Sequence, residues 1–316
     1  MIDQYGRNIT YLRLSVTDRC NLRCRYCMPQ EGVCKKPHAQ MMTEDEMIAA
    51  VEAAASLGVT KLRVTGGEPL VKRNIVSICR RAARVPGIEE LCLTTNGVLL
   101  PQLSAQLREA GVSRINLSLD TLDPDKYARI TRVGRLEQAL AGLEAALAAG
   151  WRVKINTVLI GGFNDDEVGR LAGLTLRYPV DVRFIELMPM LDSDEFGEAA
   201  FIPCTAVLER LPQAVPVAPD GGVARLYRLP DAQGNIGLIS PVSDHFCGAC
   251  NRIRLTADGK LKPCLHSADE ISLRGLTKQQ MRERMREVIW NKPACHAELS
   301  AHHHSLAGRN MNQIGG

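Results

Sequence analysis

The chain has 316 residues, of which 45% are hydrophobic and 23% are charged, as in ordinary globular proteins. Its net charge of +4 is too small to indicate a nucleic-acid-binding protein, although it suits an anionic small-molecule substrate. We find neither a signal-peptide pattern nor a segment of ~18 uncharged apolar residues, so we expect a cytoplasmic protein without a membrane partner. The 11 cysteines are an odd number, and clustered thiols in a reducing compartment bind metal more often than they form disulfides.

Strand and helix patterns alternate through the first two thirds of the chain. Strand patterns occur at residues 11–16, 61–65, 91–95, 114–119, 153–160 and 182–187, and amphipathic helical patterns at 44–57, 75–84, 102–110, 136–149 and 165–176. Thr43 and Glu46 predict a capping box at the first of these helices. Six strands alternating with helices predict an α/β fold, a partial TIM-type (βα)6 barrel, with an open doubly wound sheet as the alternative.

The pattern changes near residue 190. Residues 211–222 hold three prolines and two glycines, which is typical of a loop, and a charged amphipathic helix is expected at 278–290. The last residues have no periodicity. We therefore expect a barrel over residues 1–190, an extension over 191–300 and a flexible tail over 301–316.

Polar or glycine-rich segments follow the predicted strands. Thr17, Gly66, Asn96, Asp120 and Glu186 each lie at or just after the end of a different strand. In a parallel barrel these strand ends meet at one face, where active sites are built.

Three cysteines follow the first predicted strand. Cys20, Cys24 and Cys27 are separated by steps of four and three residues, and only Cys34 and His38 lie near enough in sequence to be a fourth zinc ligand. Three thiolates on a cubane iron–sulfur cluster would instead leave one iron open to a ligand. Together with Tyr26 and the Gly-Gly-Glu-Pro segment at 66–69, this spacing resembles the radical S-adenosylmethionine (SAM) superfamily.

That resemblance implies a cofactor and a set of ligands. Cys20, Cys24 and Cys27 would hold a [4Fe-4S] cluster whose open iron binds the amino and carboxylate groups of SAM. An electron from the cluster would cleave SAM to methionine and a 5′-deoxyadenosyl radical. The residues implied to bind SAM are Tyr26, Gly67, Ser118 and Met188.

A second set of cysteines lies near the other end of the chain. Cys247 and Cys250 are followed, after thirteen further residues, by Cys264, and Ala257-Asp258-Gly259 predicts a hairpin that brings them together. Arg252 and Arg254 share one face of its first strand, which suits a phosphate or an electron-rich base. From spacing alone, a zinc ribbon with His245 or His266 as fourth ligand is the favoured interpretation.

Whole-chain motifs favour a different interpretation. Residues 246–260 with Cys264, residues 12–29 and the terminal Gly315-Gly316 resemble the MoaA family, the GTP 3′,8-cyclases of molybdenum cofactor biosynthesis. The resemblance implies that Cys247, Cys250 and Cys264 hold a second [4Fe-4S] cluster whose open iron binds guanine, and a catalytic role for Gly315 and Gly316. The residues implied to bind GTP are Arg13, Arg63, Thr94, Lys154, Arg252, Ile253 and Arg254.

The implied reaction converts GTP to (8S)-3′,8-cyclo-7,8-dihydroguanosine 5′-triphosphate. The radical abstracts hydrogen from ribose C3′, and the C3′ radical adds to guanine C8. The resemblance also implies a reductant such as flavodoxin or ferredoxin, transfer of the product to MoaC, and a homodimer. Two alternatives remain open, a radical SAM enzyme acting on a peptide or another small molecule, and a zinc-ribbon binding protein. We assign no role to residues 302–304 or to the cysteines without ligand spacing, which are Cys34, Cys79, Cys92, Cys204 and Cys295.

Overall fold

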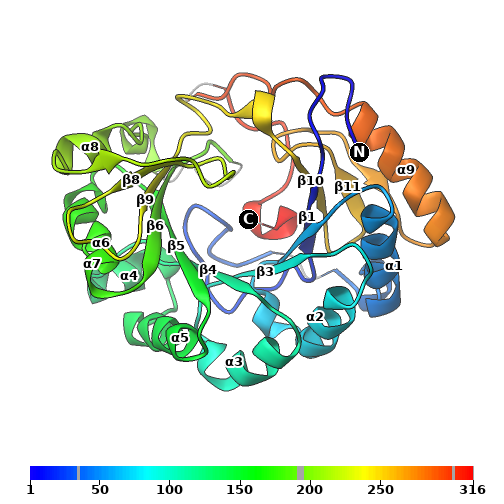
Figure 1. Cartoon of the computed structure of the whole chain (residues 1–316), viewed down its shortest axis with the longest axis horizontal. Coiled ribbons are helices and arrows are strands. Elements are labelled where there is room, and N and C mark those ends of the chain that lie inside the picture. The colour runs from blue at the N-terminus through cyan, green and yellow to red at the C-terminus, as the bar shows by residue number, and fades with distance from the viewer. Residues whose placement is uncertain (34–35, 191–195, 301–302, 316) are drawn as a thin grey trace.

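The strands form one curved sheet that makes an incomplete barrel (Figure 1). The computed structural model describes residues 1–33, 36–190, 196–300 and 303–315. Its central strands are β1 (Tyr11–Ser15), β2 (Lys61–Thr65), β3 (Glu90–Thr95), β4 (Arg114–Ser118), β5 (Arg152–Leu159) and β6 (Val180–Glu186). They lie side by side in chain order and pair in parallel. The order never reverses, as it would in a doubly wound sheet, so the barrel prediction is confirmed.

Helices cover the outside of these strands (Figure 1). They are α1 (Glu44–Ala55), α2 (Ile75–Ala83), α3 (Leu100–Glu109), α4 (Pro124–Thr131), α5 (Leu136–Ala148), α6 (Val168–Ala172) and α7 (Leu174–Arg177), with short η1 (His38–Gln40), η2 (Pro69–Val71) and η3 (Asp165–Glu167). The capping box of Thr43 and Glu46 is confirmed. The sequence patterns missed α4, and the helix expected at 165–176 is broken, with Gly173 between α6 and α7. Among the described residues, no helix is long and apolar enough to cross a membrane.

The two faces of the barrel strands differ in chemistry. Leu12 and Leu14 of β1 are fully buried in the core between strands and helices. Strand side chains alternate between faces, so Tyr11, Arg13 and Ser15 point to the opposite, inner face. The same alternation repeats in the neighbouring strands, and it gives the barrel a polar interior.

The C-terminal extension lengthens this sheet at both edges. Beside β1 it adds β10 (Arg252–Leu255), β11 (Lys260–Lys262) and β12 (Ile271–Ser272), and beside β6 it adds β9 (Ile236–Ile239), β8 (Arg225–Arg228) and β7 (Val215–Pro216). Its helices are η5 (Glu198–Ala200), α8 (Ala206–Arg210), η6 (Cys247–Ala249) and α9 (Lys278–Trp290), of which α9 packs beside α1. The β10–β11 hairpin around Ala257-Asp258-Gly259 is confirmed, and β10 pairs in parallel with β1.

The end of the chain lies in the middle of the barrel (Figure 1). The sequence predicts a flexible tail here, but residues 311–314 form α10 (Met311–Ile314). Ile314 is fully buried and packs with Met190 and Ala307. A helix of one turn is too short for a periodic sequence pattern, because its burial depends on contacts with distant segments. Gly316 lies outside the described residues.

One close backbone contact holds α5 against the loop after β3, and it predicts an effect on stability. A Cβ atom added at Gly142 would lie closer than 3.0 Å to the backbone of Gly97, whereas one added at Gly169 of α6 would meet nothing within 4 Å. We expect Gly142→Ala to destabilise the fold by about 1–3 kcal/mol through overpacking. Gly169→Ala should leave stability unchanged or raise it by up to about 1 kcal/mol. Thermal unfolding of both variants measures the change in stability. An unchanged midpoint for Gly142→Ala would show that the close contact between Gly142 and the Gly97 backbone does not require glycine.

Candidate active site

The first cysteine set lies in the loop after β1. Cys20, Cys24 and Cys27 are half-buried, and the backbone N–H of Cys27 donates to the carbonyl of Cys24 at 2.9 Å. The backbone N–H of Leu22 donates to the Cys20 sulfur at 3.3 Å. Burial raises the pKa of Cys20 to about 11 and that of Cys24 well above its ordinary value. A bound metal would supply the positive charge that keeps such thiols deprotonated.

The arrangement of the sulfur atoms distinguishes a cluster from a single ion. Within the described residues, neither Cys20, Cys24 and Cys27 nor the second set brings its three sulfur atoms within 4.8 Å of one another. The donors of a mononuclear ion converge on one point, whereas cysteines that hold a cluster each bind a different iron. Neither set of three cysteines, taken alone, therefore has the convergent donors of a mononuclear zinc site.

The Gly-Gly-Glu-Pro segment packs directly against the first cysteine loop. A Cβ atom at Gly67 would lie 2.5 Å from the carbonyl oxygen of Arg19 and 2.7 Å from that of Asp18, so only glycine fits. The backbone N–H of Gly67 donates to the carbonyl of Thr17 at 2.7 Å. This contact places the loop after β2 beside the cysteines.

Glu68 has a structural role within the protein. Its carboxylate accepts hydrogen bonds from the Thr95 hydroxyl at 2.8 Å, the Asn96 backbone N–H at 2.7 Å and the Leu70 backbone N–H at 3.0 Å. Burial raises its pKa to about 7, although these hydrogen bonds oppose the shift. Glu68 therefore joins the loops after β2 and β3.

The four residues implied to bind SAM lie at the same end of the barrel. Tyr26 and Gly67 are in the loops after β1 and β2, Ser118 ends β4, and Met188 follows β6. The Tyr26 hydroxyl donates to the carboxylate of Asp120 at 2.7 Å. Burial raises the pKa of Asp120 to about 6 and that of Tyr26 well above its usual range.

A row of arginines lines the inner face of β10, β1 and β2. The strand register places Arg254 opposite Arg13, and Arg13 opposite Arg63, while Arg252 lies opposite Tyr11. No ion pair is formed by these four arginines within the described residues. The Nε atoms of Arg13 and Arg252 are buried without a hydrogen-bond partner. The wall therefore carries positive charge that the protein itself does not neutralise.

The pKa values of this wall reflect the crowded positive charge. Burial, then the charge of Arg254, holds the pKa of Arg13 well below its usual range. Burial also lowers the pKa of Arg254 to about 10, helped by Arg252. Burial alone would raise the pKa of Tyr11, but the charges of Arg63, Arg13 and Arg252 outweigh it and lower the value to about 8. A polyanionic ligand would relieve all of these interactions.

The other three residues implied to bind GTP, which are Thr94, Lys154 and Ile253, lie in three different environments. Thr94 accepts a hydrogen bond from Arg63 Nη1 at 3.3 Å and belongs to the same wall. Lys154 is buried, but its Nζ already lies 2.7 Å from Asp220 and 3.2 Å from Asp181. The side chain of Ile253 is fully buried in the core on the opposite face of β10, which leaves only its backbone for the contact with GTP that the resemblance implies.

Three charged residues near Lys154 were not anticipated, namely Asp181, Arg183 and Asp220. Arg183 of β6 has a buried Nε without a hydrogen-bond partner and lies 3.8 Å from Asp220. The alternation along β6 places Arg183 on the same face as Asp181, so the strand pattern could have identified it. Asp220 comes from the proline- and glycine-rich loop, where no local pattern indicates a contact with β5.

The tail completes the inner wall. Arg254 Nη1 donates to the carbonyl of Gly315 at 2.7 Å, and Asn312 Nδ2 donates to the carbonyl of Asp18 at 2.8 Å. The side chain of Arg309 forms ion pairs with Glu270 at 2.6 Å and Asp258 at 3.1 Å. Gly315 has a φ of +88°, and a Cβ atom there would lie closer than 3.0 Å to the Thr65 hydroxyl. The chain end is thus held beside the arginines.

The second cysteine set lies next to this wall. Cys247 is the first residue of η6, Cys250 directly follows η6, and Cys264 follows β11. Burial alone would raise the pKa of Cys250, but the charges of Lys292 and Arg252 and a hydrogen bond from the Arg252 backbone outweigh it, so the pKa lies below its ordinary value. These interactions stabilise the thiolate form of Cys250 relative to an ordinary cysteine.

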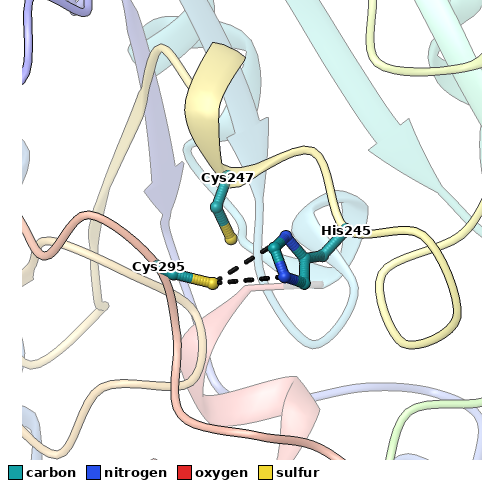
Figure 2. Close-up of side chains that lie close together, drawn as sticks. All are labelled: His245, Cys247 and Cys295. Atoms are coloured by element: carbon teal, nitrogen blue, oxygen red, sulfur yellow. Dashed lines mark hydrogen bonds between the residues drawn. The ribbon is translucent and has the colours of Figure 1, made fainter.

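The remaining cysteines divide into two groups. Cys79, Cys92 and Cys204 are buried and free, as expected of cysteines without a ligand role. Cys34 lies outside the described residues. Cys295, for which we expect no role from the sequence, lies beside Cys247 and His245 (Figure 2). Cys295 is far from the other cysteines in the sequence, so no spacing pattern indicates that it lies near Cys247.

Two family models together match most of the chain. Residues 14–174 match the radical SAM superfamily, and residues 180–298 match the family named Molybdenum Cofactor Synthesis C. Among similar proteins are a GTP 3′,8-cyclase of Alkaliphilus oremlandii, 46% identical, and one of Pelotomaculum thermopropionicum, 47% identical. Each of these alignments covers 100% of both chains.

Solved structures agree with the fold. The structure of Streptococcus suis SuiB bound to S-adenosylmethionine superposes with a TM-score of 0.64 at 13% identity, covering 92% of this chain and 66% of that one. Native anSMEcpe with bound AdoMet superposes with a TM-score of 0.55 at 13% identity, covering 88% and 83%. At this identity the likeness concerns the fold alone. The sequence matches over the whole length show that the chain belongs to the radical SAM superfamily and, within it, to the GTP 3′,8-cyclase family.

Proposed function

We propose that the chain converts GTP to (8S)-3′,8-cyclo-7,8-dihydroguanosine 5′-triphosphate in the first step of molybdenum cofactor biosynthesis. The observation that carries this proposal is the row of Arg13, Arg63, Arg252 and Arg254 on the inner wall. Guanidinium groups bind phosphate oxygens in a fixed geometry, and a triphosphate supplies the negative charge that the wall lacks. The two cysteine sets on either side suit the cofactors that the family uses.

The residues fit two [4Fe-4S] clusters and SAM. Cys20, Cys24 and Cys27 would hold the first cluster, and Cys247, Cys250 and Cys264 the second. When bound, the first cluster and SAM supply the one-electron chemistry that generates a 5′-deoxyadenosyl radical. The residues proposed to bind SAM are Tyr26, Gly67, Ser118 and Met188.

The protein itself positions the substrate and excludes water. The arginines would hold the nucleotide between the two cysteine sets, so that ribose C3′ and guanine C8 stay oriented for bond formation. Gly315, held by Arg254, would shield the site from solvent. Thr94 would orient Arg63. Lys154 would bind phosphate only if it released Asp220.

Anaerobic reconstitution tests the reaction. Protein loaded with iron and sulfide, then incubated with SAM, GTP and dithionite, should form 5′-deoxyadenosine together with the cyclised nucleotide. Formation of 5′-deoxyadenosine without any modified GTP would refute the cyclase proposal. Stoichiometric zinc and no labile sulfide in anaerobically purified protein would refute the clusters.

Arg13 provides a test of nucleotide binding. Replacing it with alanine removes a charged hydrogen-bond donor, which costs about 1.5–3 kcal/mol, or roughly 10- to 150-fold in GTP affinity. The control is Arg152→Ala, since Arg152 is exposed at the start of β5. Anaerobic calorimetry with GTP should detect a loss only in the first variant. Equal affinities in both variants would mean that Arg13 does not bind GTP.

Gly315 provides a test of the tail. Gly315→Ala adds a Cβ atom against Thr65 at a left-handed backbone position, so we expect GTP cyclisation to fall at least ~10-fold while SAM binding persists. Gly308→Ala is the matched control, because Gly308 also has a positive φ, +59°, but nothing within 4 Å of the added atom. Comparable turnover by both variants would exclude a need for close packing of the tail.

The remaining assignments are also proposals. We infer a barrel over residues 1–190, an extension over 191–300 and a tail over 301–316, a division supported by the change of pattern near residue 190. A flavodoxin or ferredoxin as reductant, MoaC as the next enzyme and a homodimer are inferred from the family. We propose a cytoplasmic location, because cluster thiolates need a reducing compartment.

A further inference from the structure

Three metal-binding side chains point toward one another beside the second cysteine set. They are His245 and Cys247, just before and at the start of η6, and Cys295, in the segment after α9 (Figure 2). The Cys295 sulfur lies 3.6 Å from His245 Nε2 and 3.8 Å from Nδ1. One donor atom from each of the three residues lies within 4.8 Å of the others. The three donors converge on one point.

Buried contacts hold the segments that carry these donors together. Arg7 donates to the carbonyls of Cys247 at 3.0 Å, Ala294 at 3.0 Å and Pro293 at 2.8 Å. Its guanidinium is itself fixed by Asp3, with 2.6 Å between Arg7 Nε and Asp3 Oδ2. One side chain therefore ties the Cys247 turn to the segment that leads into Cys295.

Further contacts position the donors individually. The backbone N–H of His296 donates to the Cys247 sulfur. The ring of His296 stacks edge to face on that of His245, with 5.4 Å between centroids. His296 itself is engaged, because its ring nitrogens lie 2.6 Å from the Ala297 carbonyl and 3.2 Å from that of Pro241. His296 therefore positions Cys247 and His245 through these contacts.

The donor set and its spacing match a known class of ion. Two thiolates and one imidazole are ligands typical of Zn²⁺, with a fourth position left to water. A tetrahedral ion bound at about 2.3 Å to sulfur and about 2.0–2.1 Å to nitrogen holds those two atoms about 3.6 Å apart. The separation between Cys295 Sγ and His245 Nε2 is 3.6 Å.

We propose that His245, Cys247 and Cys295 form a site for a thiophilic divalent cation such as Zn²⁺. The two thiols release their protons to solvent as the ion binds. Cys247 also belongs to the proposed ligand set of the second cluster, and one thiolate cannot serve both sites. The ion therefore competes with assembly of that cluster, and this competition, unlike the site itself, rests on the proposed function.

Cobalt binding to the full-length chain tests the site. The protein is prepared reduced and free of clusters, with Cys20→Ser, Cys24→Ser and Cys27→Ser removing the first set of thiols. Co²⁺ should bind with thiolate charge-transfer absorption, and Zn²⁺ should displace it. In this background Cys295→Ser and His245→Asn should each weaken binding at least ~10-fold, because each removes one of three ligands.

The matched controls are Cys250→Ser and Cys264→Ser, which alter only the cluster set and should leave cobalt affinity unchanged. Loss of affinity in these controls while Cys295→Ser binds normally would assign the ion to the cluster cysteines and overturn the proposal. Absence of a cobalt–thiolate signal in the parent chain would overturn it as well.

Iron loading tests the competition. In the same parent chain, Zn²⁺ added during reconstitution should lower the iron bound at the second set, and Cys295→Ser should relieve this inhibition. Inhibition that persists in Cys295→Ser would overturn the competition. Failure to load iron even without Zn²⁺ would count against the proposed second cluster, while the cobalt result would still decide the metal site.

Discussion

Arginine side chains on the inner wall of the barrel carry positive charge where burial makes charge costly. Arg13 of β1 and Arg254 of β10 are paired in the strand register and lie side by side on the inner face, and burial lowers the pKa of both. A fold tolerates such groups where hydrogen bonds or a ligand compensate for lost hydration. The carbonyl of Gly315 is one such partner for Arg254. The position of the tail and the proposed binding of a polyanion therefore involve the same unbalanced charge.

The fold was largely predictable because its determinants are local. Period-two alternation identified the six central strands, and an Asp-Gly turn identified the hairpin of β10 and β11. The same alternation explains why Arg252 and Arg254 face the site while Ile253 lies in the core. Ile253 was expected near the nucleotide only through resemblance, and the side-chain direction of the strand argues against a side-chain contact.

Other parts of the site depend on contacts between segments that are far apart in the chain. No local sequence pattern indicates such contacts. Asp220 approaches Lys154 from a loop whose composition indicates only irregular structure. The four residues of α10 gain burial from the barrel interior and have too little length for a helical pattern. Cys295 has no neighbouring ligand in sequence, and only the fold brings it to Cys247.

The two cysteine sets are structurally coupled, because the barrel and its extension share one sheet. β1 leads directly into the loop with Cys20, Cys24 and Cys27. One edge of β1 pairs with β2, and the other edge pairs with β10, the strand that follows Cys250. Arg7, just before β1, holds the turn of Cys247. The N-terminal segment therefore contacts the second cysteine set through Arg7 and the arginine wall through the β1–β10 register. A substrate held on that wall would be placed relative to both sets by the same strand.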